Sequence, residues 1–383
     1  MMVRRPWALL VALSLLVALV AAGTAGCAAP SGTPEAAAPS ETEEEEPEES
    51  DAAPAAPEEE VFEWKLQSSW TGIGVPHQDE VARRFVQRTK EMSGGRLLIT
   101  NYDADVLVGP TESYEATATG VIDMAVVSPG WYSGVEPVCE YMWALPFFTE
   151  HEEFYDMVYY ELGGRELWRD IYAGHNLFAL NYMLSDEWGS MCSTVPINNL
   201  SDIDGLKIRT MGIHGTFMQE QGAGITMFPP AEIYSAFSTG VVDASIFASP
   251  NGWYGMSIFE VAPYYIDPPF VPYDICEVIV SMDSWNTLPD DLKAILEASS
   301  RLHSSEWASL SVKADGTARG LLKDAGMTFC VLPDDEVIQA KNRCFEIFQA
   351  SASKDANCAA YVDIVNRALE IKSAYYGPRA IPN

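Results

Sequence analysis

The spacing of apolar positions along the chain predicts alternating strands and helices. Residues 62–69 alternate between apolar and polar side chains as a strand does, and residues 77–92 repeat their apolar positions with the period of a helix. Apolar runs at residues 97–100 and 123–128 predict two further strands, with a short helix between them at residues 111–120. Because strand, helix and strand in this order form a βαβ unit, we expect a largely parallel sheet.

The same order of elements recurs after residue 200. A strand at residues 206–209 precedes helices at residues 214–221 and 230–239, which have another strand between them. A glycine and an aspartate enclose two aliphatic residues before a strand in both halves, at residues 120–123 and 240–243. We therefore expect an α/β protein with two similarly built lobes. Four helical patterns in the last third lie near residues 287–302, 303–325, 335–351 and 357–374.

The N-terminal residues have the pattern of a targeting segment. Basic residues precede an apolar run at residues 7–22, which is shorter than the roughly 20 residues that a membrane-spanning helix needs. We therefore expect residues 1–27 to be a secretory signal that ends in a lipobox-like site, at which Cys27 becomes the acylated first residue. Cleavage after Ala22 or Ala25 with a free Cys27 is the alternative, because Thr24 stands where a lipobox usually has a leucine-like residue.

Residues 28–60 form a low-complexity segment rich in Pro, Ala, Ser and Glu. Such a segment buries too little apolar surface to fold, and its charges repel one another, so we expect a disordered acidic linker. A lipid anchor followed by this linker would hold a folded domain at the outer side of a membrane, in the periplasm or at the cell surface.

Charge and length narrow the class of protein. The 383 residues include 55 acidic and 23 basic side chains, which give a formal net charge of −32. Nucleic acids and anionic lipid surfaces are recognised by clustered Lys and Arg, so this balance argues against them as partners. A chain of this length fits two domains of ordinary size.

The signatures of common enzyme classes are missing from the sequence. It has no HExxH for zinc, no GxSxG for a hydrolase nucleophile, and no GxxxxGK[ST] or GxGxxG loop for nucleotides. Six cysteines follow Cys27 at irregular spacings, and they predict no particular disulfide. The absence of these signatures does not exclude an enzyme, but it leaves no nucleophile and base that can be named.

Arg209 is a candidate ligand-binding residue because it ends the strand at residues 206–209. Ligands of open α/β sheets bind beyond the carboxyl ends of the strands. An arginine at this place offers a planar, permanently charged group that grips a carboxylate through two hydrogen bonds. On the pattern alone, a salt bridge at the end of the strand is the alternative.

Several segments resemble one known family. The sequence reads GLKIRTMG at residues 205–212 and GAGITMFPPAEIYSAFSTGVVDA at residues 222–244, and both strongly resemble the substrate-binding proteins of TRAP transporters, the DctP-like family. Residues 93–97, 120–124 and 146–148 agree with the same family. Its members are extracytoplasmic receptors that serve the membrane subunits of ion-driven importers.

The resemblance implies a two-lobed, periplasmic-binding-protein-like fold of type II with a hinge and a helical C-terminal segment. One lobe is expected to comprise residues 61–184 with about 272–302. The other is expected to comprise residues 185–271 with about 303–383, which include the C-terminal helices. The hinge would lie where the chain crosses between these ranges, near residue 184 and near residue 272.

The resemblance also assigns roles to site residues. In this family the arginine of the GLKxR motif, here Arg209, holds the substrate carboxylate. The branch that binds α-keto acids and similar monocarboxylates is the most similar, with an aromatic loop where this chain has Trp131 and Tyr132 and a tryptophan where it has Phe247. Glu277 matches a pocket glutamate that helps to bind a cation beside the substrate.

Three positions depart from the family. Ile246 replaces a glutamate that serves some relatives as a metal ligand, and a second arginine of many relatives falls on Ser193 or Thr194. Glu187 stands where relatives place a glutamine. We therefore expect no cofactor, with bound sodium or calcium as the alternative, and an apolar or aromatic monocarboxylate as the ligand.

Aromatic residues near predicted loops are further candidates for the walls of the pocket, because ligand pockets are largely apolar. Trp70 and Trp253 belong to this group, with core packing as the alternative for each. Four other tryptophans are assigned to packing: Trp143, Trp168, Trp285 and Trp307.

These features together predict an acylated, extracytoplasmic receptor that captures a small organic carboxylate between its lobes and delivers it to the membrane subunits of a TRAP importer. Two alternatives remain open. One is a receptor that passes its ligand signal to a sensor protein, and the other is a secreted lipoprotein enzyme.

Overall fold

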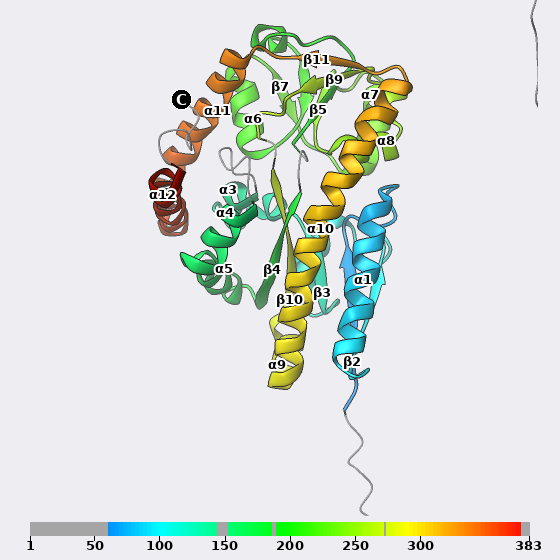
Figure 1. The fold of residues 1–383 in the computed structure, drawn as a ribbon, viewed down its shortest axis with the longest axis vertical. Helices are drawn as coiled ribbons and strands as arrows, with labels where there is room; N and C mark the ends of the chain where they lie inside the picture. Colours follow the sequence, from blue (N-terminus) through cyan, green and yellow to red (C-terminus); the bar gives the residue numbers. More distant parts are fainter. Residues whose placement is uncertain (1–59, 144–151, 186–188, 272, 377–383) are drawn as a thin grey trace, which may run out of the picture. The chain divides into compact units, whose positions relative to one another are not determined.

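The computed structural model describes residues 60–143, 152–185, 189–271 and 273–376 (Figure 1). They belong to one compact unit that begins at Glu58. The predicted signal segment, Cys27 and nearly all of the predicted linker lie outside the described residues. No helix in the described ranges is long and apolar enough to cross a membrane.

One sheet has five strands in the order β2–β1–β3–β10–β4. Strand β10 runs antiparallel to both of its neighbours, whereas β1 pairs in parallel with β2 and β3. The parallel character expected from the βαβ pattern is therefore present on either side of one reversed strand. The strands are β1 (Phe62–Ser68), β2 (Leu97–Tyr102), β3 (Met124–Val127), β4 (Leu177–Ser185) and β10 (Asp274–Ser281).

A second sheet has six strands in the order β11–β9–β5–β8–β6–β7. Here β5 is the reversed strand, because it pairs antiparallel with β8 and β9 while the other pairs are parallel. The two sheets confirm the expected α/β architecture of two similarly built lobes. The strands are β5 (Met191–Ser193), β6 (Lys207–Arg209), β7 (Gly224–Thr226), β8 (Ala244–Ile246), β9 (Tyr264–Asp267) and β11 (Thr328–Val331).

Helices follow the strands as the pattern predicts. Helix α1 (Pro76–Met92) begins with a proline, which lacks the N–H that a first helical turn leaves unpaired, and buries Val81 and Phe85 one turn apart. Both side chains join the apolar cluster that contains Leu66 of β1. The remaining helices are α2 (Ser113–Ala118), α3 (Cys139–Trp143), α4 (Glu152–Asp156), α5 (Gly164–Ala173), α6 (Gly212–Glu220), α7 (Ile233–Ser238), α8 (Pro250–Gly255), α9 (Met282–Thr287), α10 (Asp290–Asp324), α11 (Asp334–Ser351) and α12 (Ala356–Tyr376).

Helix α10 corrects the prediction of two separate helices near residues 287–302 and 303–325. It is continuous over 35 residues, because the sequence has no proline between residues 290 and 324 and the helix tolerates Gly316 and Gly320. It packs against α1 and β4 of one lobe and against α8 of the other (Figure 1). The predicted lobe boundary near residue 302 thus falls inside one helix that contacts both lobes.

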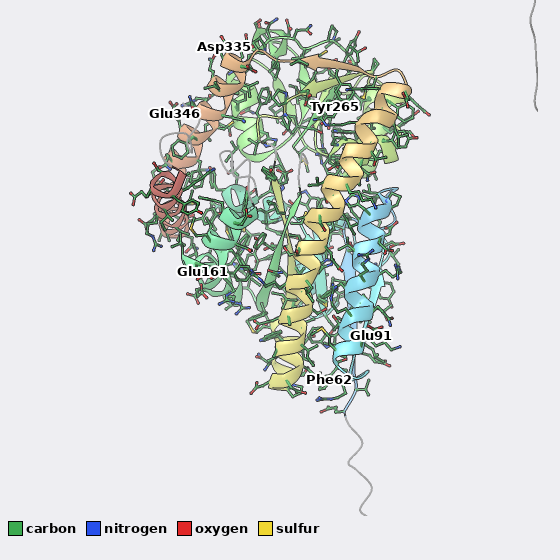
Figure 2. The ribbon with its side chains drawn as sticks, viewed as in Figure 1. Phe62, Glu91, Glu161, Tyr265, Asp335 and Glu346 are labelled. Carbon is green, nitrogen blue, oxygen red and sulfur yellow. The ribbon has the colours of Figure 1, made fainter. Side chains whose placement is uncertain are left out.

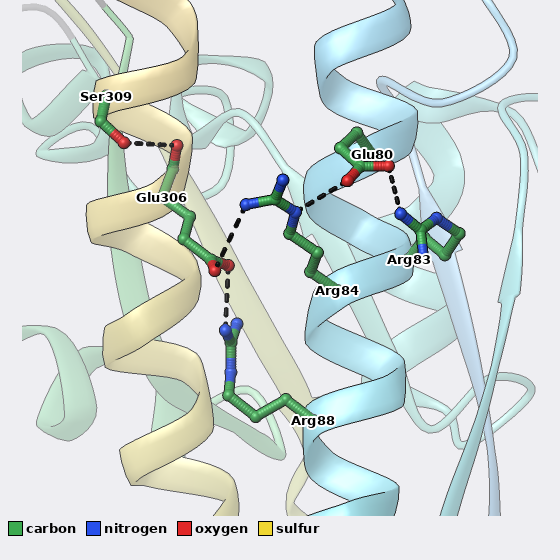
Figure 3. A network of polar contacts seen from close by, with 6 residues as sticks. All are labelled: Glu80, Arg83, Arg84, Arg88, Glu306 and Ser309. Atoms are coloured by element: carbon green, nitrogen blue, oxygen red, sulfur yellow. Dashed lines mark hydrogen bonds and ion pairs between the residues drawn. The ribbon is translucent and has the colours of Figure 1, made fainter.

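Polar contacts join α10 to α1 (Figure 3). Arg88 Nη1 donates to Glu306 Oε2 at 2.9 Å, and Arg84 Nη1 lies 3.7 Å from Glu306 Oε1. Arg84 also donates through Nε to Glu80 Oε1 at 2.8 Å. Partly exposed ion pairs contribute little to stability one by one, so the apolar face between the helices supplies most of the attraction and this network favours one register.

The other end of α10 is joined to the second sheet. Tyr265 of β9 is labelled in Figure 2. Its side chain is fully buried, and its ring lies 4.7 Å from that of Phe329. The Arg319 guanidinium of α10 covers Tyr265 and donates to Asp267 Oδ1 at 2.8 Å and Oδ2 at 3.2 Å. Asp267 ends β9, so α10 is fixed at the point where the chain leaves the second sheet.

The cysteines beyond Cys27 are buried and form no disulfide in the structure. All six lie in the described ranges: Cys139, Cys192, Cys276, Cys330, Cys344 and Cys358.

The backbones of the two lobes come very close together at two glycines. Gly74 follows β1 in the first lobe and Gly255 ends α8 in the second, and a Cβ placed on Gly255 would lie 2.0 Å from the carbonyl oxygen of Gly74. A side chain at residue 255 would therefore force the two backbones apart.

The variant Gly255→Ala is expected to lower the free energy of unfolding by about 1–3 kcal/mol, the usual cost of overpacking. Gly316→Ala serves as the matched control, because nothing lies within 4 Å of its Cβ in the middle of α10. There, alanine is expected to stabilise the protein by about 0.5–1 kcal/mol. Urea unfolding measures both, and a Gly255→Ala protein as stable as the wild type would contradict the close approach.

Candidate ligand-binding site

Arg209 ends β6, where the neighbouring parallel strands β7 and β8 also end. Its side chain is 2% exposed. Nη2 donates to the carbonyl oxygen of Phe228 at 3.0 Å, and Nη1 donates to that of Ile246 at 3.5 Å. The Arg209 guanidinium carbon also lies 4.7 Å from the centre of the Phe247 ring, a cation–π contact. Backbone and ring together fix the guanidinium group at the carboxyl edge of the sheet.

No carboxylate neutralises this charge within the described residues. None of their carboxylate oxygens lies within 4.0 Å of the Arg209 guanidinium nitrogens, and burial lowers the pKa of Arg209 to about 10. The group therefore stays protonated at neutral pH in a desolvated place. A buried cation held only by carbonyls and a ring favours an anion as its partner.

A small cavity lies in front of Arg209. Its volume is about 10 Å³, close to the space that one water molecule occupies. Its residues come from both lobes, and most lie at the carboxyl ends of strands or in the loops that follow them. The exceptions are Asp274 at the start of β10 and Trp143 at the end of α3. Most of the lining residues are aromatic or aliphatic. The complete lining is Trp70, Ser128, Trp131, Trp143, Arg209, Met211, Ile246, Phe247 and Asp274.

Three of the aromatic side chains touch across the lobes. The ring of Trp70 lies 5.1 Å from that of Trp131 and 6.2 Å from that of Phe247. Trp70 and Trp131 follow strands of the first sheet, whereas Phe247 follows β8 of the second. The apolar wall of the site is thus completed by contact between the lobes.

The structure brings four of the residues predicted for the site together: Arg209, Trp70, Trp131 and Phe247. Tyr132 does not line the cavity, and its ring packs 4.1 Å from that of Tyr114. Trp253 is buried behind Phe247 and donates from Nε1 to Ser190 Oγ at 2.8 Å. Glu187 lies outside the described residues.

Glu277 points away from the cavity. Successive residues of a strand face opposite sides, so Glu277 of β10 shares a face with Ile275 and Ile279. Its Oε1 accepts a hydrogen bond from the hydroxyl of Tyr172 in α5 at 2.6 Å. Burial raises the pKa of Glu277 to about 8. The family resemblance makes Glu277 a pocket residue, whereas in this structure its side chain lies on the face of the sheet opposite to the cavity.

Asp274 and Trp143 are cavity residues that the sequence pattern missed. Asp274 begins β10 on the other face from Glu277, and it is 1% exposed. Neither of its carboxylate oxygens has a hydrogen-bond partner among the described residues, and burial raises the pKa of its carboxyl well above the usual range. The available signal was an acidic residue at the start of a strand whose residues are otherwise apolar except for Glu277 and Ser281. Trp143, which the sequence analysis assigned to packing, ends α3 against the same cavity.

Ser193 and Thr194, which stand where many relatives have a second arginine, make hydrogen bonds to the backbone immediately before β8 of the second sheet. The hydroxyls of Ser193 and Thr194 donate to the carbonyl oxygen of Asp243 at 3.1 and 3.2 Å. Neither residue lines the cavity. Among the described residues that line the cavity, Arg209 is therefore the basic one.

The described residues do not fit a dedicated metal site. They contain no group of three or more His, Cys, Asp and Glu side chains that could hold a metal ion. Ile246, which replaces the glutamate that some relatives use, offers a carbonyl that already accepts from Arg209.

A buried cation and aromatic walls between two lobes define a solute-binding receptor. The profile of the bacterial extracellular solute-binding proteins, family 7 (DctP), matches residues 74–355. The chain belongs to this family, which confirms the resemblance seen in its sequence. The class is that of receptors and not of enzymes.

Individual relatives agree with this assignment. The chain is similar to a monocarboxylate 2-oxoacid-binding periplasmic protein of Nostoc sp. (strain PCC 7120), with 28% identity over 302 residues that cover 76% of this chain and 80% of that protein. It is also similar to a solute-binding protein of Chromohalobacter salexigens, with 27% identity over 263 residues that cover 67% and 76% of the two chains.

Solved structures of TRAP solute-binding proteins share the two-lobed fold. One from Pseudoalteromonas atlantica with bound sodium and pyruvate has a TM-score of 0.75 and 22% identity, covering 84% of this chain and 98% of that one. Another from Bordetella bronchiseptica, with copurified calcium and picolinate in one of its sites, has a TM-score of 0.75 and 20% identity, covering 83% and 94%.

Replacing Glu277 by glutamine is expected to change how stability depends on pH. Between about pH 4.5 and 8 the folded protein keeps a proton on Glu277 that the unfolded chain has released. Wild-type stability therefore falls as pH rises through this window, by up to about 1.4 kcal/mol per pH unit from this group.

In Glu277→Gln this loss disappears, so the variant gains stability relative to the wild type from pH 5 to pH 8, as measured by urea unfolding. The exposed Glu63→Gln serves as the control and is expected to leave the slope unchanged. A wild-type slope in Glu277→Gln would show that the carboxyl is not protonated in the fold.

Proposed function

We propose that this receptor captures a small organic monocarboxylate through Arg209 and delivers it to the membrane subunits of a TRAP importer. The observation that carries this proposal is the buried Arg209 guanidinium, which has no carboxylate partner among the described residues. A carboxylate on the ligand supplies the charge and the paired acceptors that this group needs.

The chemistry of the cavity favours a ligand with one carboxylate group over a ligand with two. Arg209 is the basic residue of the cavity among those described, and the buried Asp274 offers no positive charge to balance a second carboxylate. The relative from Nostoc sp. is named for monocarboxylate 2-oxoacids, and a structural neighbour holds pyruvate. Both support a monocarboxylate, and the tryptophans of the cavity favour an apolar or aromatic substituent on it.

Capture requires the lobes to separate. A cavity of about 10 Å³ admits no organic acid, so the ligand enters when Trp70 and Trp131 move away from Phe247. We place the hinge between β4 and β5 and between β9 and β10, with the lobes divided near residues 184 and 272. The ligand then shifts the lobes only as far as it prefers the closed state over the open one.

The predicted export and anchoring complete the proposal. The family is extracellular, and we place the protein outside the cytoplasm, with residues 1–27 as a signal and residues 28–60 as a linker. Acylated Cys27 would keep it at the membrane, close to the importer.

The variant Arg209→Ala is expected to weaken binding of short monocarboxylates at least about 30-fold, which corresponds to about 2 kcal/mol for a buried charge pair. Native mass spectrometry first identifies any acid that copurifies, and isothermal titration then gives its affinity. Arg209→Lys keeps the charge without the paired donors and is expected to fall between the two proteins. Arg343→Ala is the control, because Arg343 pairs with Glu220 on α6 outside the cavity. Wild-type affinity in a folded Arg209→Ala protein would overturn the proposal.

Replacing Cys27 by serine is expected to move the protein from the membrane fraction to the soluble extracytoplasmic fraction, because the acylated thiol is lost. Fractionation of cells with immunodetection measures this. Ser31→Ala in the same segment is the control and stays in the membrane fraction. An unchanged distribution of Cys27→Ser would rule out the anchor while leaving ligand capture intact.

A further inference from the structure

Asp274 is a buried acidic side chain without a partner in the described part of the chain. It is 1% exposed, and neither Oδ1 nor Oδ2 accepts or donates a hydrogen bond. A buried polar group in this state costs free energy unless something satisfies it, and such groups are rare in folded proteins. Asp274 is also a lining residue of the cavity in front of Arg209, so a ligand there can reach it.

Arg209 and Asp274 reach the cavity from different sheets. Arg209 ends β6 of the second sheet, and Asp274 begins β10 of the first. They form no ion pair within 4.0 Å, so both oxygens of Asp274 are open to a third group. Arg209 donates to the carbonyls of Phe228 and Ile246 and has further N–H groups for a ligand. Ser128 lines the same cavity after β3, and its buried Oγ also has no hydrogen-bond partner among the described residues.

We infer that Asp274 is a second polar contact for the ligand, which selects carboxylates that carry a hydrogen-bond donor on their carbon skeleton. The inference rests on the proposed function and names the ligand class of the same site: a 2-hydroxy or 2-amino monocarboxylic acid. The carboxylate of the ligand binds Arg209 in one lobe, and its hydroxyl or ammonium group donates to Asp274 in the other.

A donor is the group that suits Asp274 in either protonation state. An ionised carboxylate only accepts hydrogen bonds, and a protonated carboxyl keeps one oxygen that accepts. A ligand hydroxyl or ammonium therefore satisfies Asp274 in both forms, whereas a keto oxygen needs the protonated form. Because the two contacts lie on different lobes, one ligand that makes both favours closure.

Matched acids that differ only at the second carbon test the inference. Titration calorimetry compares three series on the wild type: pyruvate, lactate and alanine; 4-methyl-2-oxopentanoate with its 2-hydroxy and 2-amino forms; and phenylpyruvate with phenyllactate and phenylalanine. In at least one series the hydroxy or amino acid is expected to bind at least tenfold more tightly than the oxo acid. Preference for the hydroxy or for the amino form identifies the donor, and either supports the inference.

Variants of Asp274 then separate its role from a structural one. Asp274→Ala is expected to weaken the preferred acid at least tenfold while changing the affinity for the matched oxo acid less than threefold. Asp274→Asn keeps one accepting oxygen and is expected to retain more binding of a hydroxy acid than of an amino acid. Without ligand both variants are expected to melt at or above the wild-type temperature, because the buried carboxyl has no partner to lose. Asp335→Asn on the surface of α11 is the control.

The outcomes distinguish this inference from the proposed function. If oxo acids bind as tightly as their hydroxy and amino forms, or Asp274→Ala weakens all three equally, the inference is wrong and carboxylate capture by Arg209 stands. If no acid of the three series binds and Arg209→Ala changes nothing, both are wrong.

Discussion

A buried guanidinium needs partners on all sides, and the arrangement of the site follows from this need. Arg209 is held by the carbonyls of Phe228 and Ile246 and by the ring of Phe247, all from loops and strands of its own lobe. These groups orient the charge without neutralising it. The remaining side of the guanidinium faces a cavity walled by tryptophans from the other lobe. In such a low-dielectric place a hydrogen bond between opposite charges is stronger than in solvent.

Both sheets contribute to the site in the same way. Each sheet consists of parallel strands with one reversed strand, and the carboxyl ends of the parallel strands meet at the space between the lobes. The chain enters each reversed strand, β5 and β10, from a strand of the other sheet, with no helix among the described residues between the two strands. Helix α10 contacts both lobes along its length and is fixed through Arg319 to the end of β9. Lobe movement therefore requires bending at the strand junctions or adjustment along this helix.

The pleat of strand β10 places two acidic side chains, Asp274 and Glu277, on opposite faces of the sheet. Asp274 and Glu277 are both buried carboxyls, and burial raises the pKa of each. Glu277 faces α5, where the Tyr172 hydroxyl satisfies it, so its role in the fold is local. Asp274 faces the cavity without a partner among the described residues. Three positions along one strand thus separate an acid that belongs to the core from one that is available to a ligand.

Local pattern in the sequence determined the elements and the candidate Arg209. Apolar periodicity depends on neighbours along the chain, so β1, α1 and the strand that ends at Arg209 were predicted from it, and the GLKxR context gave the family. Periodicity does not show which distant segments meet. The single helix α10, the contact of Trp70 with Phe247, and the opposite faces taken by Asp274 and Glu277 were decided by tertiary structure, because each depends on how the two sheets pair and pack.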